Sequence, residues 1–416
     1  EYLGKPFIEI LRLIDDKRKK STADMAIIDE QLVKLSAEWY QELGALKKVL
    51  EDRNEELSVY GKFGQTEYTF LIMGWIPKKY LDRTKKALKI AFGDRIIVNE
   101  LEVSPENMNE APTFYDNPAF AKPFEFLIQM VSTPKYREVD PVPWLAIFFP
   151  IFFGLMVGDI GYGLIILGIA LVVKMKFKKE IWVQQLANIL IISSIPAIFF
   201  GVIFGEFFGN FGEIMGWIHP MTLFGVTWNR SEAIVTFLIL SIAIGVMHVS
   251  LGLILGIRNA LVVKSKKHAI EKLGMILVIA GIILVIGSSA HAFPATLIYP
   301  GVVLLIIALP MIIFGGGFFG AFEIISIIGN ILSYARIMAI GMASVVLAMV
   351  ANELGGMMDV AILGILIAVM LHILNIGLAM FSPFLHSLRL HLVEFNSKFY
   401  EGGGHLYTPF SKKKEG

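Results

Sequence analysis

The sequence predicts an α-helical polytopic membrane protein with a cytoplasmic α+β lobe and coiled-coil helices at its N-terminus. The 416 residues have a mean hydropathy of +0.66, and 55% of them are hydrophobic against 18% charged. That is too apolar for a soluble chain of this length. Most of the charge precedes residue 140, and long apolar segments follow it. We therefore expect a cytoplasmic domain over 1–140 and a membrane domain over 141–416.

Composition also excludes several kinds of chemistry. There are no cysteines, so disulfides and thiolate-ligated metals are excluded, and the eight histidines are scattered. No glycine-rich phosphate loop is followed by Lys-Ser or Lys-Thr, so we predict no nucleotide site. We expect no metal, no cofactor and no nucleic-acid partner. Because the sequence starts at Glu1 without a signal peptide, we expect an N-terminal portion to be missing.

The N-terminal domain is predicted to combine a long amphipathic helix with a small α+β lobe. Residues 68–75 are typical of a strand, 77–92 of a helix that starts at proline, and 95–103 of a second strand. In the long helix, apolar residues recur at spacings of three, four or seven, which favours pairing with another long helix. This stripe consists of Ile28, Leu32, Leu35, Trp39, Leu43, Leu46, Leu50 and Leu57.

The first apolar block, 144–173, is predicted to be two short helices that turn within the glycine-rich segment 158–163. A single span would place the four lysines between 174 and 179 outside, whereas a hairpin returns them to the cytoplasm, as the positive-inside rule requires. Gly158 and Gly161 would form the turn. Asp159 is interpreted as a structural cap of this turn rather than a transport residue.

Six further spans are predicted, which gives eight in total with both termini in the cytoplasm. The last two would be about 50–58 Å long at 1.5 Å per residue, against an apolar bilayer thickness of about 30 Å. They must tilt or protrude, and Pro383 can bend the final one. These spans are 182–206, 231–257, 271–290, 295–314, 319–352 and 360–398.

Arg336 and Arg389 interrupt these last two apolar segments. A guanidinium near the bilayer centre costs about 2.5–3.5 kcal/mol on insertion scales, so such residues usually face a bundle interior or an aqueous cavity. Arginine also remains protonated. The pattern indicates a fixed positive charge beside an ion path or a buried carboxylate. Pairing inside the bundle, with a purely structural role, is the alternative.

Other polar residues of these two spans are candidates for lining an ion path. Glu323 lies about 220° around the helix from Arg336 and some 20 Å toward the cytoplasm, which suits a water-filled entrance or an ordinary interfacial position. Ser333 shares the face of Arg336. His372 and His386 could instead be structural imidazoles, and Glu353 also fits an exposed helix end. The remaining candidates are Asn330, Glu353, His372, Asn375, His386 and Glu394.

At these residues the chain resembles subunit a, also called subunit I, of the rotary V-type and archaeal A-type ATPases. The resemblance rests on FP at 149–150 through GDIGYG at 158–163, on SYAR at 333–336, and on HSLRLHLVEF at 386–395. GWIP at 74–77 resembles the cytoplasmic domain of the family. These motifs occur in the same order and cover nearly the whole chain. An archaeal or bacterial type fits better than a eukaryotic one.

The resemblance implies a non-catalytic stator subunit that provides two ion half-channels against a membrane ring of proteolipid c subunits. Arg336, with Arg389 beside it, would attract the ionised ring carboxylate and block a direct leak. Glu323 would be the glutamate of the seventh helix. The 1–140 domain would contact peripheral-stalk subunits and the central-stalk adaptor, and through them the catalytic ATPase head. The expected location is the prokaryotic plasma membrane.

The chain departs from the eukaryotic pattern at two positions of the outer half-channel. Ala379 stands where those members have glutamate, and Ser344 where they have histidine, so the outer path must be lined differently. An ion-coupled secondary transporter and a structural membrane anchor are the alternatives. The sequence leaves open whether the ion is H⁺ or Na⁺, and whether ATP is mainly made or spent.

Overall fold

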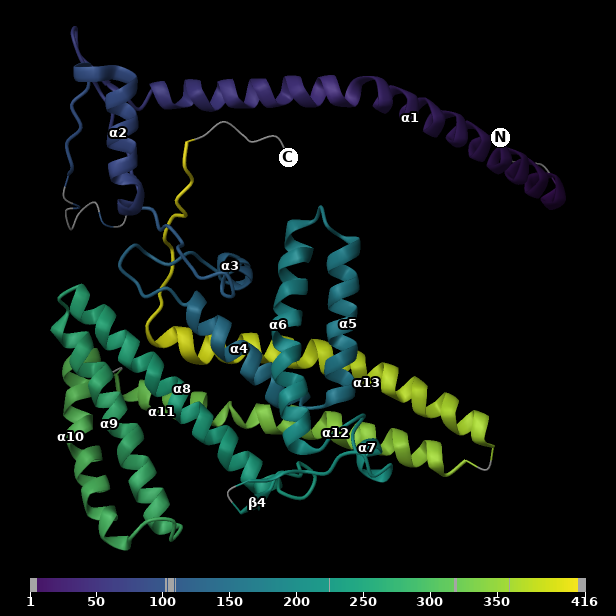
Figure 1. Cartoon of the computed structure of the whole chain (residues 1–416), viewed down its shortest axis with the longest axis vertical. Coiled ribbons are helices and arrows are strands. Elements are labelled where there is room, and N and C mark those ends of the chain that lie inside the picture. Colours follow the sequence, from purple (N-terminus) through teal and green to yellow (C-terminus); the bar gives the residue numbers. More distant parts are fainter. Residues whose placement is uncertain are drawn as a thin grey trace. The chain divides into compact units, whose positions relative to one another are not determined.

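The computed structural model describes residues 6–101, 103, 108, 110–223, 225–317, 320–358 and 360–410. Contacts divide the chain into one unit formed by Glu1–Ile97 with Thr408–Gly416 and a second formed by Val98–Tyr407. The described residues of 98–140 therefore belong to the same unit as the apolar helices. The described part is mostly helical (Figure 1).

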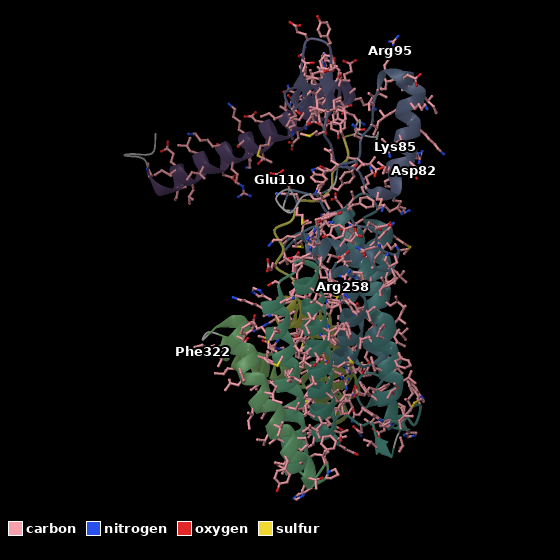
Figure 2. All side chains as sticks on the ribbon, turned by 90° about the vertical axis from the view of Figure 1, so that its left-hand side faces the viewer. Asp82, Lys85, Arg95, Glu110, Arg258 and Phe322 are labelled. Carbon is pink, nitrogen blue, oxygen red and sulfur yellow. The ribbon has the colours of Figure 1, made fainter. Side chains whose placement is uncertain are left out.

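The first unit is built on one helix of 54 residues, α1 (Phe7–Tyr60). The predicted amphipathic helix is confirmed, and it begins earlier than the apolar stripe. A short hairpin of β1 (Gly64–Gln65) and β2 (Phe70–Leu71) follows. The chain then forms η1 (Lys78–Tyr80), α2 (Leu81–Phe92) and η2 (Gly93–Arg95), so the predicted end of a helix at residue 92 is confirmed. Figure 2 shows Asp82 and Lys85 on α2.

The predicted α+β lobe is not confirmed. The strand expected over 68–75 is reduced to two residues, and the strand expected over 95–103 is wrong, because its described residues form η2 and then irregular chain. Strand propensity reflects packing on a sheet, and a two-residue hairpin offers none. Ile97 accordingly stays 84% exposed.

The second unit contains the apolar helices. Its elements are α3 (Lys122–Gln129), α4 (Val142–Val157), α5 (Ile160–Lys176), α6 (Ile181–Phe204), α7 (Phe211–Ile214), β3 (Thr222–Leu223), β4 (Val226–Thr227), α8 (Ile234–Val262), α9 (Lys266–Ser289), η4 (Ala295–Leu297), α10 (Ile298–Gly316), α11 (Gly320–Leu332), α12 (Ala335–Gly356), α13 (Ala361–Arg389), the π-helix η5 (Leu390–Phe395) and η6 (Asn396–Lys398). The strands β3 and β4 pair in antiparallel orientation.

Six helical segments of the described chain are long and apolar enough to cross a bilayer. The expected total of eight is not confirmed, because α4 and α5 have only 16 and 17 residues, below the roughly 20 that a bilayer requires. The first apolar block does divide into two helices at Gly158, as predicted. The six segments are Ile181–Phe204, Ile234–Val262, Lys266–Ser289, Ala295–Gly316, Phe322–Gly356 and Ala361–Lys398.

The helices of the second unit pack mainly in pairs. Helices α5 and α6, α9 and α10, and α12 and α13 are the main partners, and α4 packs against α6. Figure 1 shows α12 and α13 lying across the directions of the α5–α6 and α9–α10 pairs. The largest apolar core joins residues of α4, α6, α8, α9, α10, α11 and α12 with Leu390 of η5.

Two helices predicted as continuous are interrupted. The segment 319–352 breaks between α11 and α12, where Tyr334 N–H donates to Ile331 (3.1 Å) and Arg336 N–H donates to Ser333 (3.3 Å). These are bonds of the tighter 3₁₀ type. The last helix leaves α-geometry after Arg389 and continues as the π-helix η5. Arg336 therefore lies in the first turn of α12, directly after the break, and within the apolar segment Phe322–Gly356 as predicted.

Candidate functional site

The helix break and the π-helix bring Arg336 close to Glu394. Arg336 Nη1 lies 3.6 Å from Glu394 Oε1, and the two side chains are 22% and 3% exposed. That separation is too long for a good hydrogen bond. Among the described residues, neither Arg336 Nη1 nor Glu394 Oε2 has a hydrogen-bond partner. The guanidinium is thus paired in charge but incompletely satisfied in hydrogen bonds.

A buried aromatic and histidine cluster holds this geometry in place. The hydroxyl of Tyr334, at the break before Arg336, lies 2.6 Å from His248 Nδ1. The His248 ring stacks on Phe395 of the π-helix with centroids 4.0 Å apart. His391, one turn earlier in the π-helix, is fully buried beside His248. The position of both charged side chains therefore depends on α8.

The sequence interpretation missed His248, His391 and Tyr334 as parts of this site. The available signal was His248, a lone titratable residue in the middle of an otherwise apolar span. A lone histidine does not indicate its partner. Its contact with Tyr334 joins positions 86 residues apart, which periodicity within a helix cannot report.

Arg389 and His386 occupy the last turn of α13, next to this pair. The Arg389 side chain is exposed on the second unit and has no ion-pair partner among the described residues. His386 is half-buried, and its Nδ1 has no hydrogen-bond partner in the described chain. Of the two predicted arginines, one is therefore partly enclosed by this chain and the other is presented at its surface.

A second polar cluster joins α9, α11 and η6. Glu323 Oε2 lies 3.7 Å from Lys272 Nζ and is half-exposed. With its amide oxygen facing the ammonium group, Asn330 accepts from Lys398 Nζ at 2.6 Å and donates to the Ser326 carbonyl at 3.2 Å. Figure 2 shows Phe322, the neighbour of Glu323, at the edge of the helical unit. The cluster is charged and partly accessible, and the charge of Lys398 also acts on Glu394, so the cluster adjoins the Arg336–Glu394 pair.

The predicted neighbour Ser333 does not contact Arg336 through its side chain. Its hydroxyl donates to the Gly329 carbonyl at 2.9 Å, within its own helix. Glu353, toward the other end of α12, is exposed and has no side-chain hydrogen bond in the described part of the chain.

A third polar group lies further along α12 and α13, on the side away from η5. Asn375 Nδ2 donates to the Tyr162 hydroxyl and to the Ser344 carbonyl, each at 2.9 Å. The same Tyr162 hydroxyl lies 2.8 Å from His372 Nδ1, and His372 Nε2 lies 3.0 Å from Asn352 Oδ1. The predicted candidates His372 and Asn375 are therefore brought together by Tyr162 of α5, which the sequence interpretation did not assign to the path.

Asp159, Gly158 and Gly161 form a tightly packed turn between α4 and α5. The Asp159 carboxylate is buried and accepts from the backbone N–H groups of Tyr162 (3.0 Å), Phe208 (3.1 Å) and Gly209 (2.6 Å). Gly158 has φ +45°, and a Cβ there would lie 2.7 Å from the Phe204 ring. A Cβ on Gly161 would lie 2.8 Å from the Phe208 ring.

A buried arginine that the sequence interpretation did not single out closes the end of α4. Arg230 donates to both oxygens of Glu206 and to the carbonyls of the last residues of α4, Leu155, Met156, Val157 and Gly158, at 3.0–3.4 Å. It is 3% exposed and lies over the Phe204 ring. The sequence signal for this pair was a glutamate at 206 and an arginine at 230, each at the end of an apolar segment. Spacing along the sequence does not show that these two residues meet.

Metal chemistry finds no support in the described residues. No group of three or more His, Asp or Glu side chains in that part of the chain could hold a metal ion.

Comparisons with known proteins identify the family. The model of the V-type ATPase 116kDa subunit family matches residues 21–283 and 324–412, and the second range contains Arg336, Arg389 and Glu394. The chain is 31% identical to the A-type ATP synthase subunit I of Pyrococcus horikoshii, over 98% of this chain and 63% of that protein. It is 33% identical to that of Archaeoglobus fulgidus, over 84% and 59%. The chain thus spans about three fifths of the length of these relatives, and it belongs to the V-type ATPase 116kDa subunit family.

Proposed function

We propose that this chain is a stator subunit of a rotary A-type or V-type ATPase and provides two half-channels for H⁺ or Na⁺ beside a proteolipid c-ring. Ion flow along these paths would be coupled to ATP synthesis or hydrolysis by partner subunits, and this chain would be non-catalytic. Relatives named subunit I of A-type or V-type ATP synthases support the proposal. The observation that carries it is the incompletely satisfied Arg336.

Arg336 suits the role of a charge that binds and releases a carboxylate from a partner chain. Its guanidinium is always protonated, and its ion pair with Glu394 is long and lacks direct hydrogen bonds. A ring carboxylate that reached the guanidinium would gain charge-assisted hydrogen bonds that Glu394 does not make. A nearby positive charge also favours the ionised form of that carboxyl group, which promotes ion release. Exposed Arg389 would add a second positive charge at the surface facing the ring.

The polar groups described above would form two ion paths, an inner and an outer one, with Arg336 between them. The inner path would begin at Glu323 and Asn330 and reach Glu394, with Ser333 and His386 nearby. The outer path would use Asn375 and His372, with exposed Glu353 at its mouth. Arg336 stands in sequence between the inner group on α11 and the outer group on α12 and α13, and its positive charge would keep an ion from crossing except on the ring.

We infer that α4 and α5 also enter the bilayer, which gives eight spans with both termini in the cytoplasm. The four lysines at the corner between α5 and α6 support this orientation through the positive-inside rule. A buried turn held by Asp159 and Arg230 would satisfy the polar backbone where these two short helices meet. The location would be a prokaryotic plasma membrane.

The first unit, with residues up to 140, would form the cytoplasmic stator domain. The apolar stripe of α1 is exposed along its length, with Leu32, Leu43 and Leu50 each more than half exposed. Such a stripe at coiled-coil spacing needs a partner helix, and peripheral-stalk subunits would supply it. The central-stalk adaptor and the catalytic head would be reached through these contacts.

The decisive experiment is ion flux through the reconstituted membrane sector with its ring, with H⁺ and Na⁺ followed separately. We expect Arg336→Ala and the conservative Arg336→Lys to assemble normally but to lose coupled transport. Lysine keeps the charge but lacks the planar fork of donors. Unchanged coupled transport in both variants would favour a structural anchor. Solute-dependent flux without the ring would favour a secondary transporter.

A further inference from the structure

A row of six hydrogen-bonded side chains connects the buried middle of α12 to the far end of the second unit. Ser344 Oγ donates to Asn375 Oδ1 at 3.4 Å, and Asn375 donates to the Tyr162 hydroxyl. Tyr162 contacts His372, which contacts Asn352. Asn352 Nδ2 finally donates to Asn210 Oδ1 at 2.8 Å. We call these residues the outer row: Ser344, Asn375, Tyr162, His372, Asn352 and Asn210.

The donors and acceptors of the outer row all point in one direction. Asn375 Nδ2 must face the Ser344 carbonyl, and Asn352 Nδ2 must face the Phe208 carbonyl at 2.9 Å, which fixes the orientation of both amides. Asn352 Oδ1 can only accept, so His372 carries its proton on Nε2. His372 Nδ1 is then an acceptor, and the Tyr162 hydroxyl must donate to it. Every donor in the row therefore points from Ser344 toward Asn210.

The most buried members of the row lie between its two ends. Asn375 and Tyr162 are each 1% exposed, whereas Ser344 at one end and His372, Asn352 and Asn210 toward the other are half-buried. Ser344 and Asn352 follow Arg336 by about 12 and 24 Å along α12, at 1.5 Å per residue. The row thus leads from the neighbourhood of the arginine toward the surface opposite η5, where the resemblance leaves the lining of the outer path undefined.

We propose that the outer row is the outer half-channel and that it conducts protons, with Tyr162 and His372 as the two proton-transferring groups. This inference rests on the proposed function. In the outward direction, a proton from the ring carboxyl, carried by water, bonds to the Tyr162 oxygen. The original Tyr162 O–H bond breaks as the proton bonds to His372 Nδ1. The proton on Nε2 leaves to water at Asn352, which leaves His372 protonated on Nδ1. Exchange with water moves this proton from Nδ1 to Nε2 before the next transfer, and inward flow is the reverse.

The composition of the row favours H⁺ over a metal cation. Hard cations take several oxygen ligands, often carboxylates. The six side chains of the row include no carboxylate, and an imidazole stands among them. Nearby Asp159 is held by three backbone N–H groups, and Glu353 is exposed at the mouth of the path. A proton can pass through both nitrogens of this ring, but a cation would have to displace it. The absence of the glutamate and histidine of eukaryotic members, at Ala379 and Ser344, is then compensated by Tyr162 and His372.

Tyr162→Phe and His372→Gln test the outer row in the reconstituted membrane sector with its ring. Phenylalanine keeps the ring and removes the shared hydroxyl, whereas glutamine keeps hydrogen bonding and removes the titratable group. We expect H⁺ flux to fall about a hundredfold in each, the lower end of what a positioned proton-transfer group contributes. The matched controls are Tyr400→Phe, which removes a hydroxyl that donates to Ser132 at 2.6 Å, and His219→Gln, at an exposed site. Both should keep wild-type flux.

The outcomes separate this inference from the proposed function. A larger H₂O/D₂O flux ratio in His372→Gln than in wild type would support a proton relay, because a purely structural defect would not change the isotope effect. Wild-type flux in Tyr162→Phe and His372→Gln, with flux abolished in Arg336→Ala, would overturn the outer row and leave the function standing. Coupling to Na⁺ instead of H⁺ would also overturn it. If the Tyr162→Phe variant fails to assemble, H⁺ flux through the His372→Gln variant decides between the outcomes, because the His372 side chain is only half-buried.

Discussion

Arg230 and Arg336 are both held among apolar helices, but only Arg230 is fully satisfied. Arg230 donates to a carboxylate and to four backbone carbonyls, and it is 3% exposed. Arg336 has one carboxylate at 3.6 Å, an unpartnered Nη1 and 22% exposure. The first arrangement leaves no donor for a further ligand, whereas the second leaves Nη1, itself buried, without a hydrogen bond. A buried charge alone therefore does not indicate function, and we base the proposed role of Arg336 on its incomplete hydrogen bonding.

The two sites also differ in what surrounds them. Arg230 closes the C-terminal end of α4, where free carbonyls and the helix dipole favour a positive charge. Arg336 lies in the first turn of α12, where its own N–H bonds to the Ser333 carbonyl and, within the described chain, its guanidinium binds no free carbonyls of a helix end. Only Glu394 compensates its charge in that part of the chain. A carboxylate from a partner would complete the compensation.

Replacing Arg230 should give the largest loss of stability. Arg230→Leu would leave Glu206 buried and unpaired and four carbonyls without their donor, and breaking a buried pair costs about 3–5 kcal/mol. We expect a lower thermal midpoint of the purified membrane sector and reduced assembly. Arg230→Leu combined with Glu206→Leu removes both charges and should recover part of the loss. Normal assembly of the single variant would contradict a structural role.

Removing the hydroxyl of Tyr334 should give an intermediate effect. In Tyr334→Phe, fully buried His248 loses its 2.6 Å partner, and an unsatisfied buried group costs about 1–3 kcal/mol. Because Tyr334 lies at the break before Arg336, coupled transport should fall as well as the thermal midpoint. Tyr400→Phe serves as the control, because the Tyr400 hydroxyl donates to the Ser132 carbonyl and not to His248. A change in stability with intact coupling would limit Tyr334 to packing.

The sequence was sufficient for features that depend on neighbouring residues. Apolar length predicted the long helices, and charge within an apolar run drew attention to Arg336 and Arg389. It was insufficient where a contact depends on how helices meet. The pairs Arg336–Glu394 and His248–Tyr334 join different helices, and the π-helix that presents Glu394 has no local signal such as proline or glycine within 390–395. Helical spacing placed Ser333 beside Arg336, but with the break at 333–334 the Ser333 hydroxyl bonds to the Gly329 carbonyl and not to Arg336.

Removing both charges of the Arg336–Glu394 pair should change stability by less than about 1 kcal/mol, in contrast with Arg230→Leu, because replacing a whole buried ion pair is often neutral or stabilising. Arg336→Leu alone leaves buried Glu394 unpaired and should be less stable. Arg336→Leu with Glu394→Gln is therefore the variant to compare. Its thermal midpoint should stay near wild type while coupled transport is lost. A loss as large as that of Arg230→Leu would make the two arginines equivalent and remove the distinction between them.

The exposed pair of Lys135 and Glu401 should show the smallest effect and mark the lower end of the comparison. Lys135 Nζ lies 2.6 Å from Glu401 Oε2, but the glutamate side chain is 78% exposed, so solvent screening limits the pair to about 0–1 kcal/mol. The hydrogen bond from Lys135 lowers the pKa of Glu401, and Glu401 raises the pKa of Lys135. The ion pair therefore contributes its full stabilisation at pH values between the pKa values that the two groups have in the unfolded chain. This stabilisation is lost as the pH falls through the lowered pKa of Glu401. It is also lost as the pH rises through the raised pKa of Lys135. Glu401→Gln should lower the thermal midpoint slightly at neutral pH and not at all in acid. A large decrease in the thermal midpoint that does not depend on pH would contradict this prediction, because it would mean that the contact holds the C-terminal segment far more strongly than an exposed ion pair allows.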